Sequence, residues 1–107
     1  MNELIIATLK PLGIPVCSLY YQGIETTYIT FFELIAQGGS WANNKETNTE
    51  HHVQIDIWSK DNYTDIVTQT KTLLKNIDFH RNYETEMYES DTKTFHKIIR
   101  VIKNEDI

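Results

Sequence analysis

The sequence is short of cysteine and of positive charge, and each shortage excludes a class of protein. Its single cysteine, Cys17, cannot form a disulfide within the chain. Fifteen acidic against ten basic residues give a net charge of −5, so the chain has little positive charge with which to displace counterions from a nucleic acid. We therefore expect neither an intrachain disulfide nor direct, sequence-specific binding to DNA or RNA.

Long apolar runs are also absent from the sequence. The N-terminus lacks the charged segment, long apolar core and cleavage site of a secretory signal. No stretch approaches the roughly 20 apolar residues that cross a bilayer. A hydrophobic content of 40% with 23% charged residues is ordinary for a globular protein. We expect a soluble, cytosolic chain that forms one domain over residues 1–107 and makes no contact with a membrane.

An alternating stretch in the middle of the chain organises the expected fold. Within residues 51–58, Val53, Ile55 and Ile57 share one face and polar residues share the other. This period of two predicts a strand with one buried side. From Tyr63 to Ile77, apolar residues then recur every three or four positions, which predicts a helix of about four turns that packs on the strand.

The ends of this helix and the other expected elements follow from local signals. Ser59 or Asp61 is expected to cap the first free amides of the helix. Breaks at proline, glycine and polar clusters separate the remaining elements. They are a short helix over residues 2–10, an extended piece over 16–20, a strand over 27–35 and a flexible loop or arm over 37–50.

Two further stretches, residues 79–88 and 94–103, predict a closing hairpin with its turn near residues 90–92. The expected register places apolar partners together on one face and mostly polar partners on the other. Its pairs are Met87–Phe95, Tyr83–Ile99 and Arg81–Val101 on one face, and Glu86–His96 and Asn82–Arg100 on the other. The sequence thus predicts an α+β fold, with a mostly antiparallel sheet of three to four strands, an N-terminal helix and one longer amphipathic helix.

Reactive residues are present but do not converge in this fold. His51 and His52 point to opposite faces of their strand, and His80 is expected opposite Ile102, away from His96. Cys17 lies in an apolar stretch with nothing to lower its thiol pKa. We therefore expect no catalytic residue, no metal site and no cofactor.

Two other polar features also have ordinary explanations. The carboxylates Glu84, Glu86 and Glu89 fit a solvated strand face whose charges are paired. The pair Gly38-Gly39 is not followed by the lysine or the spacing of a phosphate-binding loop, and we expect it to let the chain turn into the arm.

Trp41, within the polar arm, is the residue most relevant to function. A tryptophan in such a loop either packs on the core of its own domain or binds in a pocket of a partner protein, and both alternatives stay open. Trp58, at the polar side of the central strand, has the same two alternatives. The candidate interface residues are Gln37, Trp41, Asn43, Lys45 and Trp58.

The order of elements resembles the small tail-completion, or tail terminator, and head-to-tail joining proteins of long-tailed, siphovirus-type phages and prophages. The closest part is residues 52–59 (HVQIDIWS), a strand that ends Trp58-Ser59 and leads through a polar residue into a long helix. These families are short and divergent, and they have no catalytic motif. The resemblance implies a mixed sheet with helices packed on it and a structural rather than an enzymatic role.

The resemblance also implies partners and a location. Copies of the chain would form a ring, hexameric in the family's manner, at the head-proximal end of the tail tube, where the ring stops tube growth and joins the capsid. The partners would be the tail tube protein and the head completion or connector protein. Assembly would occur in the host cytoplasm, and the ring would then stay at the head–tail junction of the virion. The alternative is a small acidic phage-encoded regulatory or anti-host protein-binding module.

Overall fold

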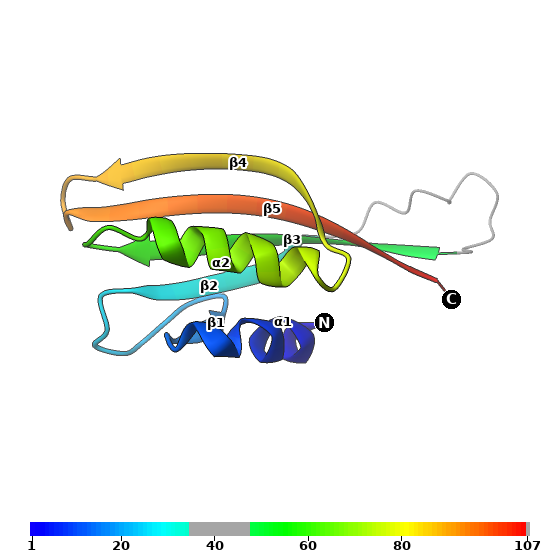
Figure 1. The fold of residues 1–107 in the computed structure, drawn as a ribbon. Coiled ribbons are helices and arrows are strands. Elements are labelled where there is room, and N and C mark those ends of the chain that lie inside the picture. Colours follow the sequence, from blue (N-terminus) through cyan, green and yellow to red (C-terminus); the bar gives the residue numbers. More distant parts are fainter. Residues whose placement is uncertain (35–47, 107) are drawn as a thin grey trace.

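The computed structural model describes residues 1–34 and 48–106. In these residues the chain forms two α-helices, a short 3-10 helix and five strands (Figure 1). In chain order the elements are α1 (Asn2–Leu9), η1 (Lys10–Leu12), β1 (Val16–Ser18), β2 (Tyr28–Leu34), β3 (Asn48–Ser59), α2 (Thr64–Lys75), β4 (His80–Glu89) and β5 (Thr94–Asp106).

The strands form one mixed sheet in the order β1-β2-β3-β5-β4. β1 and β2 are parallel, and every other neighbouring pair is antiparallel. The predicted α+β class with a mostly antiparallel sheet is confirmed. The predicted number of three to four strands is too low, because Val16–Ser18 pairs with β2 as a fifth strand. An edge strand of three residues is too short for an alternating pattern to reveal it.

Both helices pack on the same face of the sheet, with α1 beside β1 and α2 across the middle (Figure 1). The apolar face predicted for the central strand is confirmed, and the apolar stripe of the longer helix packs on it through buried Leu74 and half-buried Ile66, Val67 and Leu73. The buried core comprises Ile5, Leu9, Ile29, Phe31, Val53, Ile55, Ile57, Tyr63, Leu74, Phe79, Ile99 and Val101.

The start of α2 differs from the prediction. The helix begins at Thr64, and the side-chain oxygen of Asn62 accepts a hydrogen bond from the Thr64 amide at 3.0 Å. Ser59 is instead the last residue of β3, where it is buried and its hydroxyl accepts from the Asp61 amide at 3.0 Å. The predicted caps, Ser59 and Asp61, are therefore wrong, because the strand and the turn after it use both residues.

The β4–β5 hairpin begins in the predicted register and then leaves it. His80 lies opposite Ile102 and Arg81 opposite Val101, as predicted, but a β-bulge follows between Arg81 and Tyr83. The bulge adds one residue to β4, so the later side chains of this strand lie on the face opposite to the predicted one. The pairs Asn82–Arg100, Tyr83–Ile99, Glu86–His96 and Met87–Phe95 are wrong, and the observed pairs are Tyr83–Arg100, Glu84–Ile99, Glu86–Lys97 and Met87–His96.

β3 and β5 continue together beyond the rest of the sheet. β2 ends at Leu34 opposite His52, and β4 begins at His80 opposite Ile102. Beyond these positions β3 and β5 pair as a two-stranded ribbon, residues 48–51 with 103–106, which extends past the end of α2 (Figure 1). Residues 48–50 thus belong to a strand rather than to the arm predicted over 37–50, and Gln37, Trp41, Asn43 and Lys45 lie outside the described residues.

Candidate functional site

The face of the sheet opposite the helices is the candidate site, and we call it the helix-free face. Its side chains alternate along each strand with those of the core, as the register of neighbouring strands requires. No helix of the described part of the chain packs on it. The helix-free face includes Tyr28, Thr30, Phe32, Leu34, His52, Gln54, Asp56, Trp58, Tyr83, Thr85, Met87, Glu89, His96, Ile98, Arg100 and Ile102.

Trp58, a predicted interface residue, lies in an aromatic row across this face. Its ring stacks on His96, with centroids 3.7 Å apart and planes 11° apart, and its centroid lies 6.1 Å from that of Tyr28. Its indole N–H donates to Thr30 Oγ1 at 3.1 Å. Trp58 is therefore held by its own sheet, while it remains half-buried rather than covered. A rigid, half-buried tryptophan on such a face is typical of an interface anchor.

A chain of polar contacts lies beside this row. Asp56 Oδ1 is 2.7 Å from His96 Nε2 and accepts from Gln54 Nε2 at 3.0 Å. The other end of the Gln54 amide accepts from Arg100 Nε at 3.1 Å, and the guanidinium lies 5.3 Å from the centre of the Tyr83 ring. These contacts join β3, β5 and β4 and hold the polar groups of the face in one arrangement.

The Asp56–His96 pair has the form of an oriented general base, but its surroundings oppose that role. An imidazole oriented by a carboxylate can move protons when a substrate reaches the ring. Here Asp56 is 5% exposed, His96 is 8% exposed, and Trp58 stacks over the imidazole. The pair therefore satisfies two buried polar groups and positions the tryptophan.

The helix-free face is apolar and aromatic around this polar chain. Tyr83 and Met87 are 49% and 47% exposed, although each belongs to a regular strand. Permanent charges are few, since Asp56 is paired, Arg100 is bound to Gln54, and Glu89 lies at the turn end of β4. Interface cores are depleted of charge and enriched in tyrosine, tryptophan, phenylalanine, methionine and arginine. This face has that composition.

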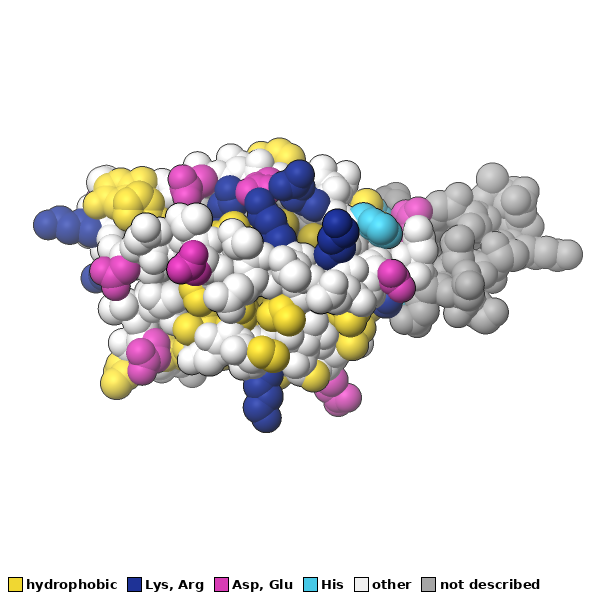
Figure 2. Space-filling view, in the orientation of Figure 1, with side chains coloured by type: hydrophobic (Ala, Val, Ile, Leu, Met, Phe, Trp, Pro, Cys, Tyr) yellow, Lys and Arg dark blue, Asp and Glu magenta, His cyan; other side chains and the backbone are white. Residues whose placement is uncertain are grey.

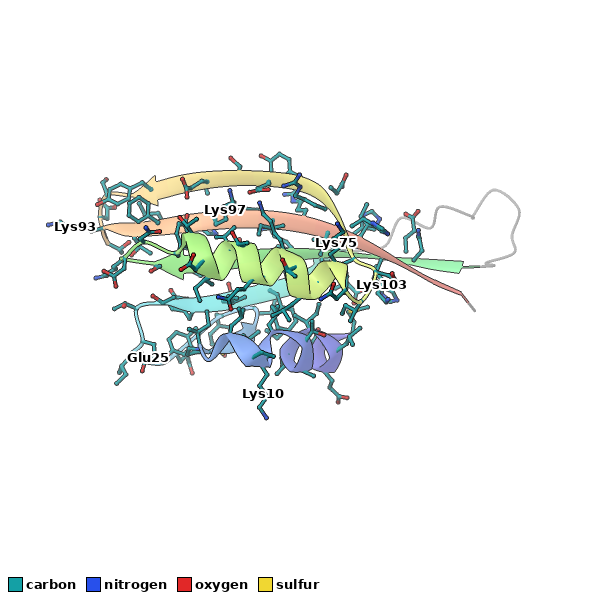
Figure 3. The ribbon with its side chains drawn as sticks, viewed as in Figure 1. Lys10, Glu25, Lys75, Lys93, Lys97 and Lys103 are labelled. Atoms are coloured by element: carbon teal, nitrogen blue, oxygen red, sulfur yellow. The ribbon has the colours of Figure 1, made fainter. Side chains whose placement is uncertain are left out.

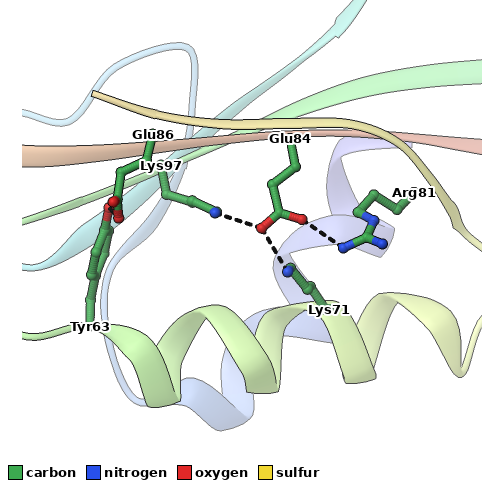
Figure 4. A network of polar contacts seen from close by, with 6 residues as sticks. All are labelled: Tyr63, Lys71, Arg81, Glu84, Glu86 and Lys97. Atoms are coloured by element: carbon green, nitrogen blue, oxygen red, sulfur yellow. Dashed lines mark hydrogen bonds and ion pairs between the residues drawn. The ribbon is translucent and has the colours of Figure 1, made fainter.

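The helix-bearing side carries the charges instead, and Glu84 is their centre (Figure 4). Its carboxylate accepts from Lys71 Nζ and Arg81 at 2.7 Å and lies 2.5 Å from Lys97 Nζ. Partial burial alone would raise the pKa of Glu84, but hydrogen bonds from the three cations outweigh it and lower the pKa to about 2. The predicted pairing of this carboxylate is confirmed, but the predicted solvated face is wrong: Glu84 is 19% exposed on the helix-bearing side, where α2 and β5 supply two of its partners.

Glu86 is the second carboxylate of this side. It accepts a hydrogen bond from the hydroxyl of Tyr63 at 2.5 Å, which joins the residue just before α2 to β4 (Figure 4). Burial, together with the hydrogen bond and the negative charge of Glu86, raises the pKa of Tyr63. The phenol therefore stays protonated, and the contact has a structural role.

Histidines also pair with carboxylates elsewhere in the sheet. His51 Nδ1 lies 2.6 Å from Glu33 Oε2, and His52 Nε2 lies 3.1 Å from Glu50 Oε1. Within residues 1–34 and 48–106, no group of three or more histidine, cysteine or acidic side chains is arranged to hold a metal ion. That the protein has no metal and no cofactor stays a prediction.

Comparisons with known proteins do not assign a family. No protein-family model matches the sequence, and no curated protein matches it significantly. Neither described helix is long and apolar enough to cross a membrane. The function must therefore be inferred from the geometry of the helix-free face and from the resemblance of the central strand and helix.

Proposed function

We propose that this chain is a structural subunit that completes a phage tail, and that its copies form a ring at the head-proximal end of the tail tube. The partners in this proposal are the tail tube protein and the head completion or connector protein. The observation that carries it is the helix-free face, because Trp58, Tyr83 and Met87 stand accessible on a rigid sheet. Such a surface supports an assembly role better than a catalytic one.

The size of the helix-free face supports this proposal. With strands about 4.8 Å apart and residues about 3.3 Å apart, four strands of about eight residues span roughly 500 Å² in projection. The accessible surface of side chains is larger than their projection. A specific interface of standard size takes about 800 Å² from each partner. The face is therefore of the same order of size as one partner's share of a standard interface.

The charge of the chain also supports contact through this face. Two copies with a net charge of −5 each repel one another. Contact between surfaces with few charges minimises this repulsion and avoids the desolvation of unpaired charged groups. Each copy would therefore contact a different surface of its neighbour in the ring at lower free-energy cost through the helix-free face than through its acidic surfaces.

A substitution on the edge strand β4 of this face tests the proposal. Met87→Glu introduces a charge on the helix-free face, whereas Ile24→Glu introduces the same charge at a side chain that is 95% exposed elsewhere. We expect wild type and Ile24→Glu to form rings, alone or on tail tubes, and Met87→Glu to fail. Size-exclusion chromatography with light scattering and negative-stain images, with and without tails, measure the outcome. Both variants should melt near the wild-type temperature, because both positions are exposed.

Two results would contradict the proposal. One is a wild-type chain that stays monomeric both alone and with tail tubes; the other is a Met87→Glu variant that assembles normally. A stable monomer or dimer that captures a host protein would instead favour the regulatory or anti-host module.

A further inference from the structure

The outer edge of β4 has no partner strand in the described part of the chain. β4 is the last strand in the order β1-β2-β3-β5-β4, so the backbone N–H and C=O groups on its outer side pair with no described strand. In Figure 1 this edge is the upper border of the sheet, and neither α1 nor α2 covers it. Along the same border, Figure 2 shows apolar, acidic and basic side chains beside one another. Such an edge is a template on which another strand can form hydrogen bonds.

The length and regularity of β4 suit it to a partner strand. Natural edge strands are commonly very short, interrupted by proline or a bulge, or covered. β4 has 10 residues and no proline. Its bulge lies near its start, between Arg81 and Tyr83, and the register from Tyr83 to Glu89 is regular. Tyr83 and Met87 are 49% and 47% exposed on this strand, so apolar surface also remains uncovered there.

The side chains of β4 on the helix-free face complement a second copy of the same strand. The bulge places His80, which pairs with Ile102, next before Tyr83 on this face, and Thr85, Met87 and Glu89 follow. When Thr85 of two antiparallel copies lies opposite itself, Tyr83 of each copy lies opposite Met87 of the other. At the ends of the row, His80 then lies opposite Glu89. An aromatic ring thus packs on a thioether, and an imidazole meets a carboxylate.

The helix-bearing side of β4 permits the same register. Arg81 lies opposite Tyr88 of the second copy, which allows a cation–π contact. Glu84 lies opposite Glu86, but three cations of its own chain bind Glu84, and Glu86 accepts a hydrogen bond within its own chain. A shift of two residues in either direction would place Glu84 or Glu86 opposite itself and would separate the exposed apolar partners. The apolar pairs therefore favour the register centred on Thr85.

We infer that the outer edge of β4 is an interaction surface for a second copy of this chain, and that two copies join their sheets antiparallel about Thr85. Backbone hydrogen bonds along the edge provide affinity, and the cross-strand pairs provide the register. This contact goes beyond the proposed ring and does not depend on it. It relates two copies by a twofold axis, whereas a ring needs a contact between two different surfaces.

Opposite charges at position 85 test the twofold axis. Two lysines would face each other in Thr85→Lys and two glutamates in Thr85→Glu, whereas in an equal mixture a lysine can face a glutamate. Thr72→Lys and Thr72→Glu are the matched controls, because Thr72 is an exposed threonine of α2, one turn before Lys75 (Figure 3). Sedimentation equilibrium without tail tubes measures the dissociation constant of the pair at about 50 mM salt, where surface charges are weakly screened.

We expect each Thr85 variant alone to raise the dissociation constant about tenfold, because like charges that face each other across strands repel. The equal mixture should return to within about threefold of wild type. The Thr72 variants, alone and mixed, should stay within about twofold of wild type. Mixing recovers association only where a position faces itself, so a contact between two different surfaces would not give this result.

Hydrogen exchange of the wild-type chain gives a second measurement that needs no substitution. Amides of β4 should exchange more slowly as the protein concentration is raised through the dissociation constant, whereas amides of β2 should not change. The β4 contact is refuted if wild type forms no pairs, if the mixture associates no better than each Thr85 variant alone, or if β4 exchange is independent of concentration. Met87→Glu would weaken both contacts, but images with tail tubes score the proposed ring separately, and the ring can stand when this contact fails.

Discussion

Replacing Glu84 by glutamine should remove the charge that joins α2 to the β4–β5 hairpin. The side chain is 19% exposed, and it binds Lys71 from α2, Lys97 from β5 and Arg81 from its own strand. Glutamine keeps the size of the side chain but offers the three cations a neutral acceptor. The variant therefore reports the contribution of charge with little change in packing.

The expected cost follows from the lowered pKa. A fall from 4.5 to about 2 corresponds to at most about 3.4 kcal/mol, at roughly 1.36 kcal/mol for each pH unit. Solvent screens part of this, because Arg81 is 58% exposed and Lys71 is 33% exposed. We therefore expect Glu84→Gln to lower the free energy of unfolding by about 1–2 kcal/mol at pH 7.

The stability that Glu84 contributes depends on pH, and the direction of its pKa shift fixes the direction of that dependence. Because the folded state lowers the pKa of Glu84, its contribution is complete above about pH 4.5 and is lost as the pH falls toward 2. Urea titrations at pH 7, 5, 4 and 3 measure the free energy of unfolding of wild type and of Glu84→Gln. The difference between the two should become smaller below pH 4.5. Glu89→Gln, an exposed carboxylate on the same strand, is the control and should change stability by less than about 0.5 kcal/mol.

Two outcomes would refute this reasoning. If the difference in the free energy of unfolding between wild type and Glu84→Gln stays constant from pH 7 to pH 3, the substitution acts through packing rather than charge. If Glu84→Gln lowers the free energy of unfolding at pH 7 no more than Glu89→Gln does, solvent screens the charges around Glu84 completely.

Other predictions concern the core, metal ions and the arm. Leu74→Ala should lower the free energy of unfolding by about 2–5 kcal/mol in a denaturant titration. Leu4→Ala, on the exposed side of α1, should lower it far less. Equal losses would contradict the assignment of Leu74 to the buried face of α2. Chelator should leave the melting temperature unchanged and zinc should not raise it, so a clear fall of the melting temperature with chelator would contradict the prediction that the protein holds no metal. If Trp41 belongs to an assembly arm, Trp41→Ala should weaken ring formation at nearly constant stability; a loss of about 3–5 kcal/mol with unaltered assembly would place it in the core.

Local patterns in the sequence determined most elements of this protein and the buried side of the central strand and of the longer helix. Val53, Ile55 and Ile57 alternate with polar residues, and Leu74 belongs to an apolar stripe, because strand and helix geometry fix which neighbours along the chain share a face. The α+β class follows from those patterns. They also placed Trp58 on the solvent side of its strand, although they did not show that His96 would stack on it.

Tertiary structure alone decided the register of β4 and the composition of both candidate surfaces. Asp56 and His96 are in contact although 40 positions separate them in the sequence. Glu84 reaches Lys71 only because the bulge in β4 moves its side chain to the helix-bearing face. The local alternation of the hairpin favoured the register without the bulge, and that register is wrong beyond Arg81. The choice between the two registers depends on partners that α2 and β5 bring from elsewhere in the chain, and a pattern of sequence neighbours does not contain those contacts.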